Sequence, residues 1–461
     1  MGRGPARSGG RRRGGRKKGL QAALDQQLAS EIETLVGPGA VAGLDFRTLE
    51  IAVRQRALQL AARAIERRLN ADLSDGVRAS RRCPCGQEAR RAGRRSKRFE
   101  TALGPLKLER AYYHCTACGR GFCPRDQALG FAAGSLSPAV LQMVARVGAM
   151  VSFEEGSDLL AALAGVTLDA KHVERAAEAL GTQIADDEQH RVEPPRGNPP
   201  PTLYLGMDGT GIPMRSAELL GRRGKQTDGS AKTREAKLCA VWSAEGRDEH
   251  GLAVRDPGSV TYSAAIESAA SDDTDEGYPA FAQRVRREAQ RRGFEHASRQ
   301  VILGDGAPWI WNLASEHFPQ AIQIVDRFHA KQHLSDTAKA IWGADSALGR
   351  DWAAERHAEL DRGDLDALLN ALRVHQATEP EARRCLDYVD RNRHRMRYPD
   401  FHRRGLCTST GVLEAGCKVV VATRLKRAGM HWTLRGANAI LALRCAKLSG
   451  RLAAFWQHRA A

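Results

Sequence analysis

The sequence predicts an α/β protein in which a mixed-sheet domain carries an all-α insertion and follows a cysteine-rich module and a helical region. Three observations support this prediction. Short apolar runs alternate with amphipathic segments in the second half of the chain, which is typical of α/β domains. Five of the ten cysteines lie between Cys83 and Cys123. Residues 331–405 are almost wholly helical in pattern, with leucines at helical spacing between Leu365 and Leu372.

Composition limits the class of protein. The 461 residues suffice for two or three domains, and 42% are hydrophobic, so a large core can be buried. The formal net charge of +17 favours a polyanionic partner, most commonly nucleic acid, although a basic protein without such a partner is the alternative. We find no signal-peptide pattern and no apolar stretch long enough for a membrane span, so we expect a soluble, cytoplasmic protein without a membrane partner.

The chain begins with a basic segment. Residues 1–18 contain eight Arg and Lys and no acid, so we expect 1–19 to be a disordered arm that neutralises phosphates, or else a solubilising tail. Residues 20–80 should be helical. Four apolar residues there recur near heptad spacing and predict a packing face, within the chain or between subunits: Phe46, Leu49, Val53 and Leu60.

A cysteine-rich module is expected over 81–128. Cys83-Pro-Cys85 and Cys115-Thr-Ala-Cys118 are paired thiols of the kind that hold tetrahedral Zn²⁺ in a zinc ribbon. The first pair is one residue short of the usual C-x-x-C, so Cys123 or His114 could replace a ligand. Buried free thiols are the alternative. Basic side chains in the same module favour contact with DNA phosphates: Arg94, Arg95, Lys97 and Arg98.

Residues 129–190 are expected to form a helical DNA-binding region. Segments 152–163 and 169–180 flank the turn 165–167, as in a helix-turn-helix, although an ordinary helical hairpin has the same pattern. The proline-rich segment 191–201 predicts a linker.

The first part of the catalytic core is expected over 202–330. The predicted strands are Leu203–Met207, Lys237–Trp242, Ser259–Ser263, Gln300–Leu303 and Ala321–Val325, and the predicted helices are Tyr278–Arg292 and Pro308–His317. The all-α insertion follows over 331–405, and 406–461 supplies the final helices. This order of elements is that of a ribonuclease H-like domain with an all-α insertion.

Two aspartates each follow an apolar strand and precede a glycine. They are Asp208 in LYLGMDGTGI and Asp305 in VILGDGAPWIW. Acids at the ends of strands in one sheet can converge on Mg²⁺ or Mn²⁺. Glu414, near the start of a basic helical stretch, could complete such a site. Two metals held in this way stabilise the attacking and leaving oxygens of phosphodiester transfer.

The segments MDGTGIPM, ILGDGAPWIWNLA, VDRFHAKQHL and GVLEAGCKVVVATRLKRAGMHW resemble DDE transposases of bacterial insertion sequences, most closely the ISKra-type family. The resemblance runs from about residue 80 to 450. It implies a ribonuclease H-like fold and maps the catalytic acids onto Asp208, Asp305 and Glu414. It also implies transposon-end and target DNA as partners, a dimer or larger assembly, and the bacterial nucleoid as the place of action. The choice of Glu414 rests on this resemblance.

Asp326 and His329 add a finer match. Related Mutator-like transposases carry Cys or Asp, two residues and His after the second catalytic aspartate. This resemblance implies an accessory role for both residues, with His329 orienting the DNA. A structural histidine at a strand–helix junction is the alternative.

Further side chains near Glu414 are candidates for contacts with DNA phosphates, although a solvated basic face would have the same pattern: Lys418, Arg424, Lys426 and Arg427. Three tryptophans nearby could stack on an unpaired base, but we expect them to be core: Trp309, Trp311 and Trp432. The cysteines outside the module are expected to be structural.

Together these features predict a DNA transposase that cleaves transposon ends and joins the 3′-hydroxyl to target DNA. The alternatives are another ribonuclease H-like nuclease of the resolvase or repair type, and a non-catalytic DNA-binding regulator derived from a transposase.

Overall fold

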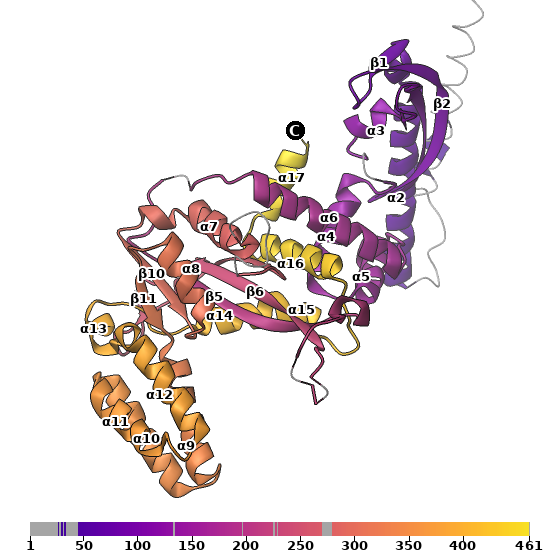
Figure 1. The fold of residues 1–461 in the computed structure, drawn as a ribbon. Coiled ribbons are helices and arrows are strands. Elements are labelled where there is room, and N and C mark those ends of the chain that lie inside the picture. Colours follow the sequence, from indigo (N-terminus) through magenta and orange to yellow (C-terminus); the bar gives the residue numbers. More distant parts are fainter. Residues whose placement is uncertain are drawn as a thin grey trace, which may run out of the picture. The chain divides into compact units, whose positions relative to one another are not determined.

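The computed structural model describes residues 45–460 except 132–133, 196, 225, 228 and 270–278, with a few positions between 26 and 33. The basic arm expected at 1–19 lies outside these residues. The chain forms two compact units (Figure 1). The first comprises residues up to 144 and 154–170, and the second comprises 145–153 and 171–461.

The first unit is built on a long helix and a four-stranded antiparallel sheet. Its elements are α2 (Phe46–Ala71), β1 (Ser80–Arg82), β2 (Glu88–Thr101), β3 (Gly104–His114), β4 (Gly121–Phe122) and α3 (Pro124–Ala128). Asp45 caps α2 by accepting a hydrogen bond from the Thr48 N–H at 3.0 Å. The hairpin of β2 and β3 buries Phe99, Leu106 and Leu108 against Ala62 of α2. Apolar burial between helix and hairpin therefore forms one core of this unit.

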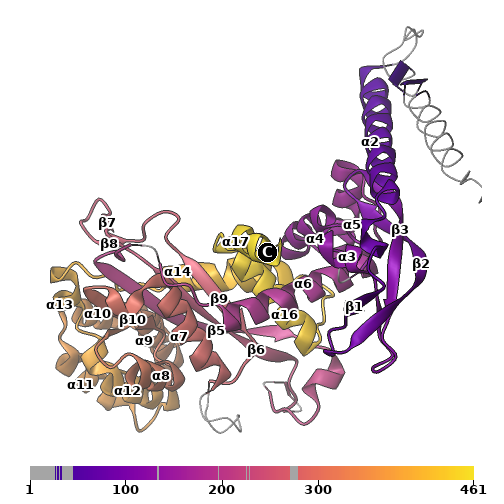
Figure 2. The ribbon, with the colours of Figure 1, turned by 90° about the horizontal axis from the view of Figure 1, so that it is seen from above.

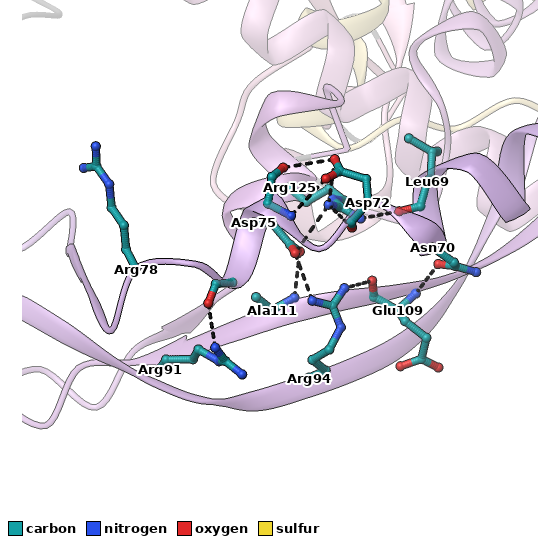
Figure 3. A network of polar contacts seen from close by, with 12 residues as sticks. Leu69, Asn70, Asp72, Asp75, Arg78, Arg91, Arg94, Glu109, Ala111 and Arg125 are labelled. Carbon is teal, nitrogen blue, oxygen red and sulfur yellow. Dashed lines mark hydrogen bonds and ion pairs between the residues drawn. The ribbon is translucent and has the colours of Figure 1, made fainter. Parts of the chain in front are cut away.

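A buried carboxylate fastens α2, α3 and β3 together (Figure 3). Asp75 accepts hydrogen bonds from the Ala111 N–H at 2.8 Å and from Arg94 at 2.9 Å. Arg125 lies 3.3 Å from the same carboxylate and donates to the Asp72 carbonyl at 2.6 Å. Because Asp75 has two cationic partners and a backbone donor, its burial is compensated.

Helices follow the sheet. They are α4 (Pro138–Met150), α5 (Phe153–Leu159), the π-helical turn Leu160–Ala164 and α6 (Ala170–His190). Gly165 ends the π-helical turn in the left-handed conformation, with φ 68°. The helices predicted at 152–163 and 169–180 are both found. The second one, α6, continues to His190, well beyond the predicted end at residue 180. These helices divide between the two units.

The second unit contains a five-stranded mixed sheet in the order β11-β10-β5-β6-β9. The strands are β5 (Thr202–Pro213), β6 (Thr233–Trp242), β9 (Thr261–Ala265), β10 (Arg299–Gly304) and β11 (Ile322–Val325). Strands β5, β6 and β9 pair antiparallel, whereas β10 is parallel to both β5 and β11. A two-stranded ribbon pairs β7 (Gly246–Arg247) with β8 (Ala253–Val254). All five predicted strands are found, with shifted ends.

The prediction that the first strand ends before Asp208 is wrong. Strand β5 continues to Pro213, because β6 pairs with it as far as Thr233. Gly209 and Gly211 do not end the strand, because their pairing with Lys237 and Glu235 keeps this backbone extended. Asp208 is therefore inside a long hairpin arm, level with the carboxyl end of β10.

Helices cover both faces of the sheet. On one face, α14 (Gly411–Gly416) packs so closely that a Cβ at Gly206 would lie 2.7 Å from Leu413. On the opposite face lie α7 (Ala280–Arg292) and α8 (Pro308–His317) (Figure 1). The predicted bounds of α8 are confirmed. The apolar sheet is therefore buried on both sides, and its polar groups reach solvent only where strands end.

The free edge of β9 is closed by α16 (Leu434–Leu448) and the residue after it. Asn438 accepts a hydrogen bond from the Ile266 N–H at 2.7 Å, and Ser449 accepts one from the Tyr262 N–H at 2.9 Å. Side chains thus replace the missing strand. The last helix is α17 (Leu452–Ala460).

Between β11 and α14 the described chain is helical. It forms α9 (Arg327–Trp342), α10 (Ala347–Arg362), α11 (Leu365–His375), α12 (Pro380–Asn392) and α13 (Tyr398–Arg403). These helices gather beside the β10–β11 side of the sheet (Figure 2). Tyr398 donates a hydrogen bond to the Val325 carbonyl at 3.1 Å, which fastens the helices to β11. Among the described helices, none combines the length and hydropathy that a membrane span requires.

Candidate functional site: a row of carboxylates and a cluster of thiols

Three aspartates lie level with one another on neighbouring strands: Asp305 and Asp326 directly follow β10 and β11, and Asp208 lies within β5. The parallel register pairs Leu303 with Gly206 and Gly304 with Val325. Continuing these registers sets Asp305 beside Asp208 on one side and beside Asp326 on the other. Adjacent strands are about 4.8 Å apart, so neighbouring side chains of this row point to one region. Asp208 is two residues after Gly206 in the same strand, so its side chain points to the same face of the sheet, which α14 covers.

Asp208 is held in a half-buried position. Its Oδ1 accepts a hydrogen bond from the Gly209 N–H at 2.6 Å, and its Oδ2 accepts one from the Cys417 thiol at 3.2 Å. Burial raises the pKa of Asp208, and the negative charge of Asp305 raises it further, while the two hydrogen bonds and His329 act in the opposite direction. A bound cation would relieve this penalty on the charged carboxylate.

Asp305 is positioned by the turn that follows it and by α12, a helix that is distant in the sequence but in contact with this turn. Its Oδ1 accepts a hydrogen bond from the Ala307 N–H at 2.9 Å, and its carbonyl accepts one from Tyr388 of α12 at 2.8 Å. Gly306 has φ 103°, and a Cβ there would lie 2.4 Å from the Tyr388 ring. The glycine after Asp305 is therefore needed both for backbone conformation and for the approach of Tyr388.

Asp326 differs from the other two aspartates because its carboxylate is fully engaged within the protein. It is 1% exposed and accepts hydrogen bonds from the backbone N–H groups of His329, at 2.7 Å, and Thr410. It thereby caps α9 and holds the residue that precedes α14. These contacts suit a positioning role. His329, in the first turn of α9, is half-buried.

Glu414 lies in the first turn of α14 and is exposed. Its helix continues through a π-helical turn, Cys417–Ala422. Arg444 of α16 crosses this turn and donates to the carbonyls of Val419 and Val420, the latter at 2.7 Å. A π-helical turn leaves carbonyls without their usual partners, and this buried guanidinium supplies donors to them.

The carboxylates do not form a compact cage. Among the described residues, only the four cysteines have potential ligand atoms that all lie within 4.8 Å of one another. No described Lys, Arg or His forms an ion pair with Asp208, Asp305 or Glu414. Asp208 and Asp305 therefore lie side by side without a described ion-pair partner, and Glu414 is exposed in the first turn of α14.

The thiols of the cysteine-rich module have the geometry of a metal centre. Cys83 and Cys118 are 3.6 Å apart at sulfur, and Cys85 and Cys115 are 3.7 Å apart. Four thiolates around zinc, each with a bond of about 2.3 Å, stand about 3.8 Å apart. The shortened Cys83-Pro-Cys85 pair therefore suffices, and neither Cys123 nor His114 belongs to the cluster. Hydrogen bonds from the Gln87 N–H and from the neighbouring thiols lower the pKa of Cys85 to about 7. Burial and the neighbouring thiols raise the pKa of Cys83, so the thiolate is favoured at Cys85 and not at Cys83.

The side chains predicted to contact DNA divide by exposure. Lys418, Lys426, Arg95 and Arg98 are exposed, whereas Lys97 and Arg427 are half-buried. Arg94 contributes to the Asp75 network and donates to the Glu109 carbonyl at 2.5 Å, so its guanidinium is largely used inside the protein.

The expectation that Arg424 contacts DNA does not agree with its burial. Arg424 is 0% exposed, donates to the Gly148 carbonyl at 3.0 Å and lies over the rings of Phe153 and Trp432. Trp311 and Trp432 are buried, as expected for core residues, and Trp309 is half-buried.

Three residues that shape the site were not singled out by the sequence for this purpose. Cys417 was considered structural, yet its thiol contacts Asp208. Its spacing from Glu414 was the available signal, because i and i+3 share a helix face. Tyr388 and Arg444 are brought to the site only by the tertiary fold.

The fold and site thus define a mixed α/β protein with a carboxylate row at the sheet edge and a separate cluster of four cysteines. The chain belongs to the uncharacterised protein family UPF0236, whose model matches residues 40–458. No curated protein matches the chain. Among solved structures, it is similar to a Drosophila P element transposase strand transfer complex, with 8% identity and a TM-score of 0.25 over 70% of this chain and 81% of that one. A score this low establishes neither fold nor function.

Proposed function

We propose that this chain is a DDE-type DNA transposase that cleaves transposon ends and transfers the 3′-hydroxyl into target DNA. The observation that carries the proposal is the placement of Asp208 and Asp305 level with each other on parallel strands, beneath the helix of Glu414. The sheet order, with three antiparallel strands followed by two parallel ones, is that of ribonuclease H-like domains. The helices α9 to α13 correspond to an all-α insertion.

The carboxylate site fits divalent cations such as Mg²⁺ or Mn²⁺. Asp208 and Asp305 lie side by side, and no described Lys, Arg or His forms an ion pair with either of them. Burial also disfavours the charged form of Asp208. Carboxylate oxygens are preferred ligands of Mg²⁺, which keeps further positions for water and phosphate. When bound, a metal pair would stabilise the attacking and leaving oxygens of phosphodiester transfer.

The protein's own contribution is to position these ligands. Tyr388 holds the Asp305 backbone, and Asp326 ties α9 to the start of α14. Cys417 orients Asp208. Lys418 and Lys426 are exposed near Glu414 and are suited to contact the phosphates of the bound DNA.

The four cysteines are suited to a structural zinc ion. All four potential ligands are thiols, so the set is closed and leaves no open position for a substrate. We propose that the zinc-bound module, with exposed Arg95 and Arg98, contacts the DNA of the transposon end. Synapsis of two ends would require a dimer or a larger assembly.

Strand transfer tests the proposal. The protein is incubated with labelled DNA carrying the element's ends, plasmid target and Mg²⁺ or Mn²⁺. We expect joined product from the wild type. Asp208→Asn and Asp305→Asn should lose more than the ~100-fold that follows loss of a residue supporting a metal ligand. Asp366→Asn, on exposed α11, is the matched control and should remain active.

The products also separate the alternatives. Cleavage without joined product would favour a nuclease of the resolvase or repair type. DNA binding without either product would favour a regulator. Strand transfer that persists in Asp208→Asn would exclude this carboxylate row as the active site.

A further inference from the structure

The hairpin of β5 and β6 extends beyond the end of the neighbouring strand β10 (Figure 1). Beyond Asp208, the pairing continues from Gly209 with Lys237 to Pro213 with Thr233. At a rise of about 3.3 Å per residue, this extension spans roughly 13 Å. The arm therefore starts beside the proposed metal ligands and leads away from them.

A polar groove of about 640 Å³ lies beside the β6 strand of this arm and the residues that follow β9. Its lining includes Arg222, Arg223, Arg234 and Lys237, with Glu235 and Glu267 as the only acids among the described lining residues. Such a density of cations at one surface would attract a polyanion.

The two acids of the groove are already paired. Glu235 lies 2.9 Å from Lys237, and Glu267 accepts hydrogen bonds from Arg284 at 2.9 and 2.6 Å. After these pairs are subtracted, the positive charge that remains in the groove comes from three arginines: Arg222, Arg223 and Arg234. Within the described chain, none of the three guanidinium groups forms an ion pair.

Arg222 and Arg234 are close enough for their positive charges to repel each other, and Arg223 lines the same groove. The backbone of Arg223 is fixed by a β-bridge to Ser230, and Arg234 lies in β6. Burial lowers the pKa of Arg234, and the positive charge of Arg222 lowers it further. Like charges at this separation cost free energy unless an anion lies between them, and phosphate is a good bidentate partner for guanidinium.

The lining also indicates which part of a nucleic acid would bind. No aromatic side chain is among the described lining residues, so bases have no stacking surface. A sugar–phosphate backbone therefore fits better than a base-specific ligand.

We propose that this groove binds the phosphate backbone of the DNA strand that leaves the carboxylate site, without reading its sequence. The inference rests on the proposed function, because it takes its DNA from the same site. It adds a binding surface whose three arginines lie on β6 and in the residues between β5 and β6.

Salt dependence of DNA binding tests the groove independently of catalysis. Binding of a labelled duplex is measured by fluorescence anisotropy in EDTA, from low to moderate salt. The triple variant Arg222→Gln, Arg223→Gln, Arg234→Gln should lower the slope of log affinity against log salt by about 2 to 3, since each phosphate contact contributes about 0.9. Its affinity should fall at least about tenfold at moderate salt.

Two matched variants control for net charge and folding. Replacing exposed Arg350, Arg362 and Arg373 of α10 and α11 by Gln removes the same charge elsewhere and should leave the slope nearly unchanged. Lysine at positions 222, 223 and 234 keeps the charge and should restore most of the slope. Thermal midpoints of all variants confirm that each is folded.

The outcomes separate this inference from the proposed function. If the wild type binds DNA and the groove variant behaves like the α10–α11 control, the assignment of the groove as a DNA-binding surface is wrong. The transposase proposal then still stands. If the wild type neither binds nor joins DNA, both fail. If RNA of equal length binds more tightly through the same arginines, the assignment to DNA is overturned.

Discussion

At the scale of single residues, Asp208 shows how the site balances stability against metal binding. Its carboxylate is half-buried, hydrogen-bonded to Gly209 and Cys417, and level with Asp305. Its raised pKa means that the fold favours the protonated form. The free energy of unfolding of the metal-free protein therefore falls as the pH rises above 3.8 and through the raised pKa. Metal ligation reverses this penalty, because it requires the charged form.

Asp208→Asn should accordingly stabilise the metal-free protein at neutral pH. Asn has the same size and removes the penalty of burying a charge beside Asp305. We expect a higher thermal midpoint than wild type at pH 7 to 8, with the difference shrinking as the pH approaches 4. Added Mn²⁺ should raise the midpoint of the wild type and not that of the variant. A variant less stable than wild type at pH 8 without metal would contradict this account.

These residues were selected from the sequence on different physical grounds. Asp208 and Asp305 both follow apolar runs, which predicts a polar residue at the end of a buried strand. The structure agrees for Asp305, whereas β5 continues past Asp208 because β6 pairs with it. Glu414 has no such local signal and was selected by family resemblance. Arg424 was misjudged because a helical pattern with several cations does not show which of them turns toward Phe153 and Trp432.

At the scale of elements, the π-helical turn after Glu414 depends on α16. Arg444 is 6% exposed and donates to carbonyls of that turn and of Ala149, and to Thr423 at 2.8 Å. The turn was not foreseeable from the sequence, since residues 411–425 have an ordinary helical pattern. Its stability comes from a side chain that is distant in the chain. The position of Glu414 therefore depends on packing between two helices.

Replacing Arg444 by Met should expose this dependence. Unsatisfied buried carbonyls cost about 1–3 kcal/mol each, so the midpoint of urea denaturation should fall clearly. Because the turn follows α14, affinity for Mn²⁺ at the carboxylate row should fall as well. Lysine at this position keeps one point charge and should give an intermediate result. Arg435→Gln, on the exposed side of α16, is the control, and an equal loss there would show a general effect on the helix.

At the scale of the whole molecule, two kinds of metal ligand are assigned to two separate units. The thiol cluster belongs to the first unit and the carboxylate row to the second. Soft thiolates suit zinc, and hard carboxylates suit magnesium or manganese. The positions of the strands and helices along the second unit followed well from apolar periodicity. The first unit was predicted by its cysteines, because its strands are short or rich in arginine.

This separation predicts that loss of zinc will destabilise the sheet of the first unit and not the sheet of the second. Cys85 is an exposed ligand, so Cys85→Ser removes a thiolate with little loss of packing. We expect about one zinc ion per chain in the wild type and much less in the variant. Amide protons of β1 to β4 should lose protection from exchange, because metal binding and folding of such modules are coupled. Those of β5, β6 and β10 should stay protected, since that sheet has its own core.

Cys123→Ser, whose sulfur lies outside the cluster, should keep both the zinc and the protection. Exchange that accelerates equally in both sheets would show instead that the two units fold as one.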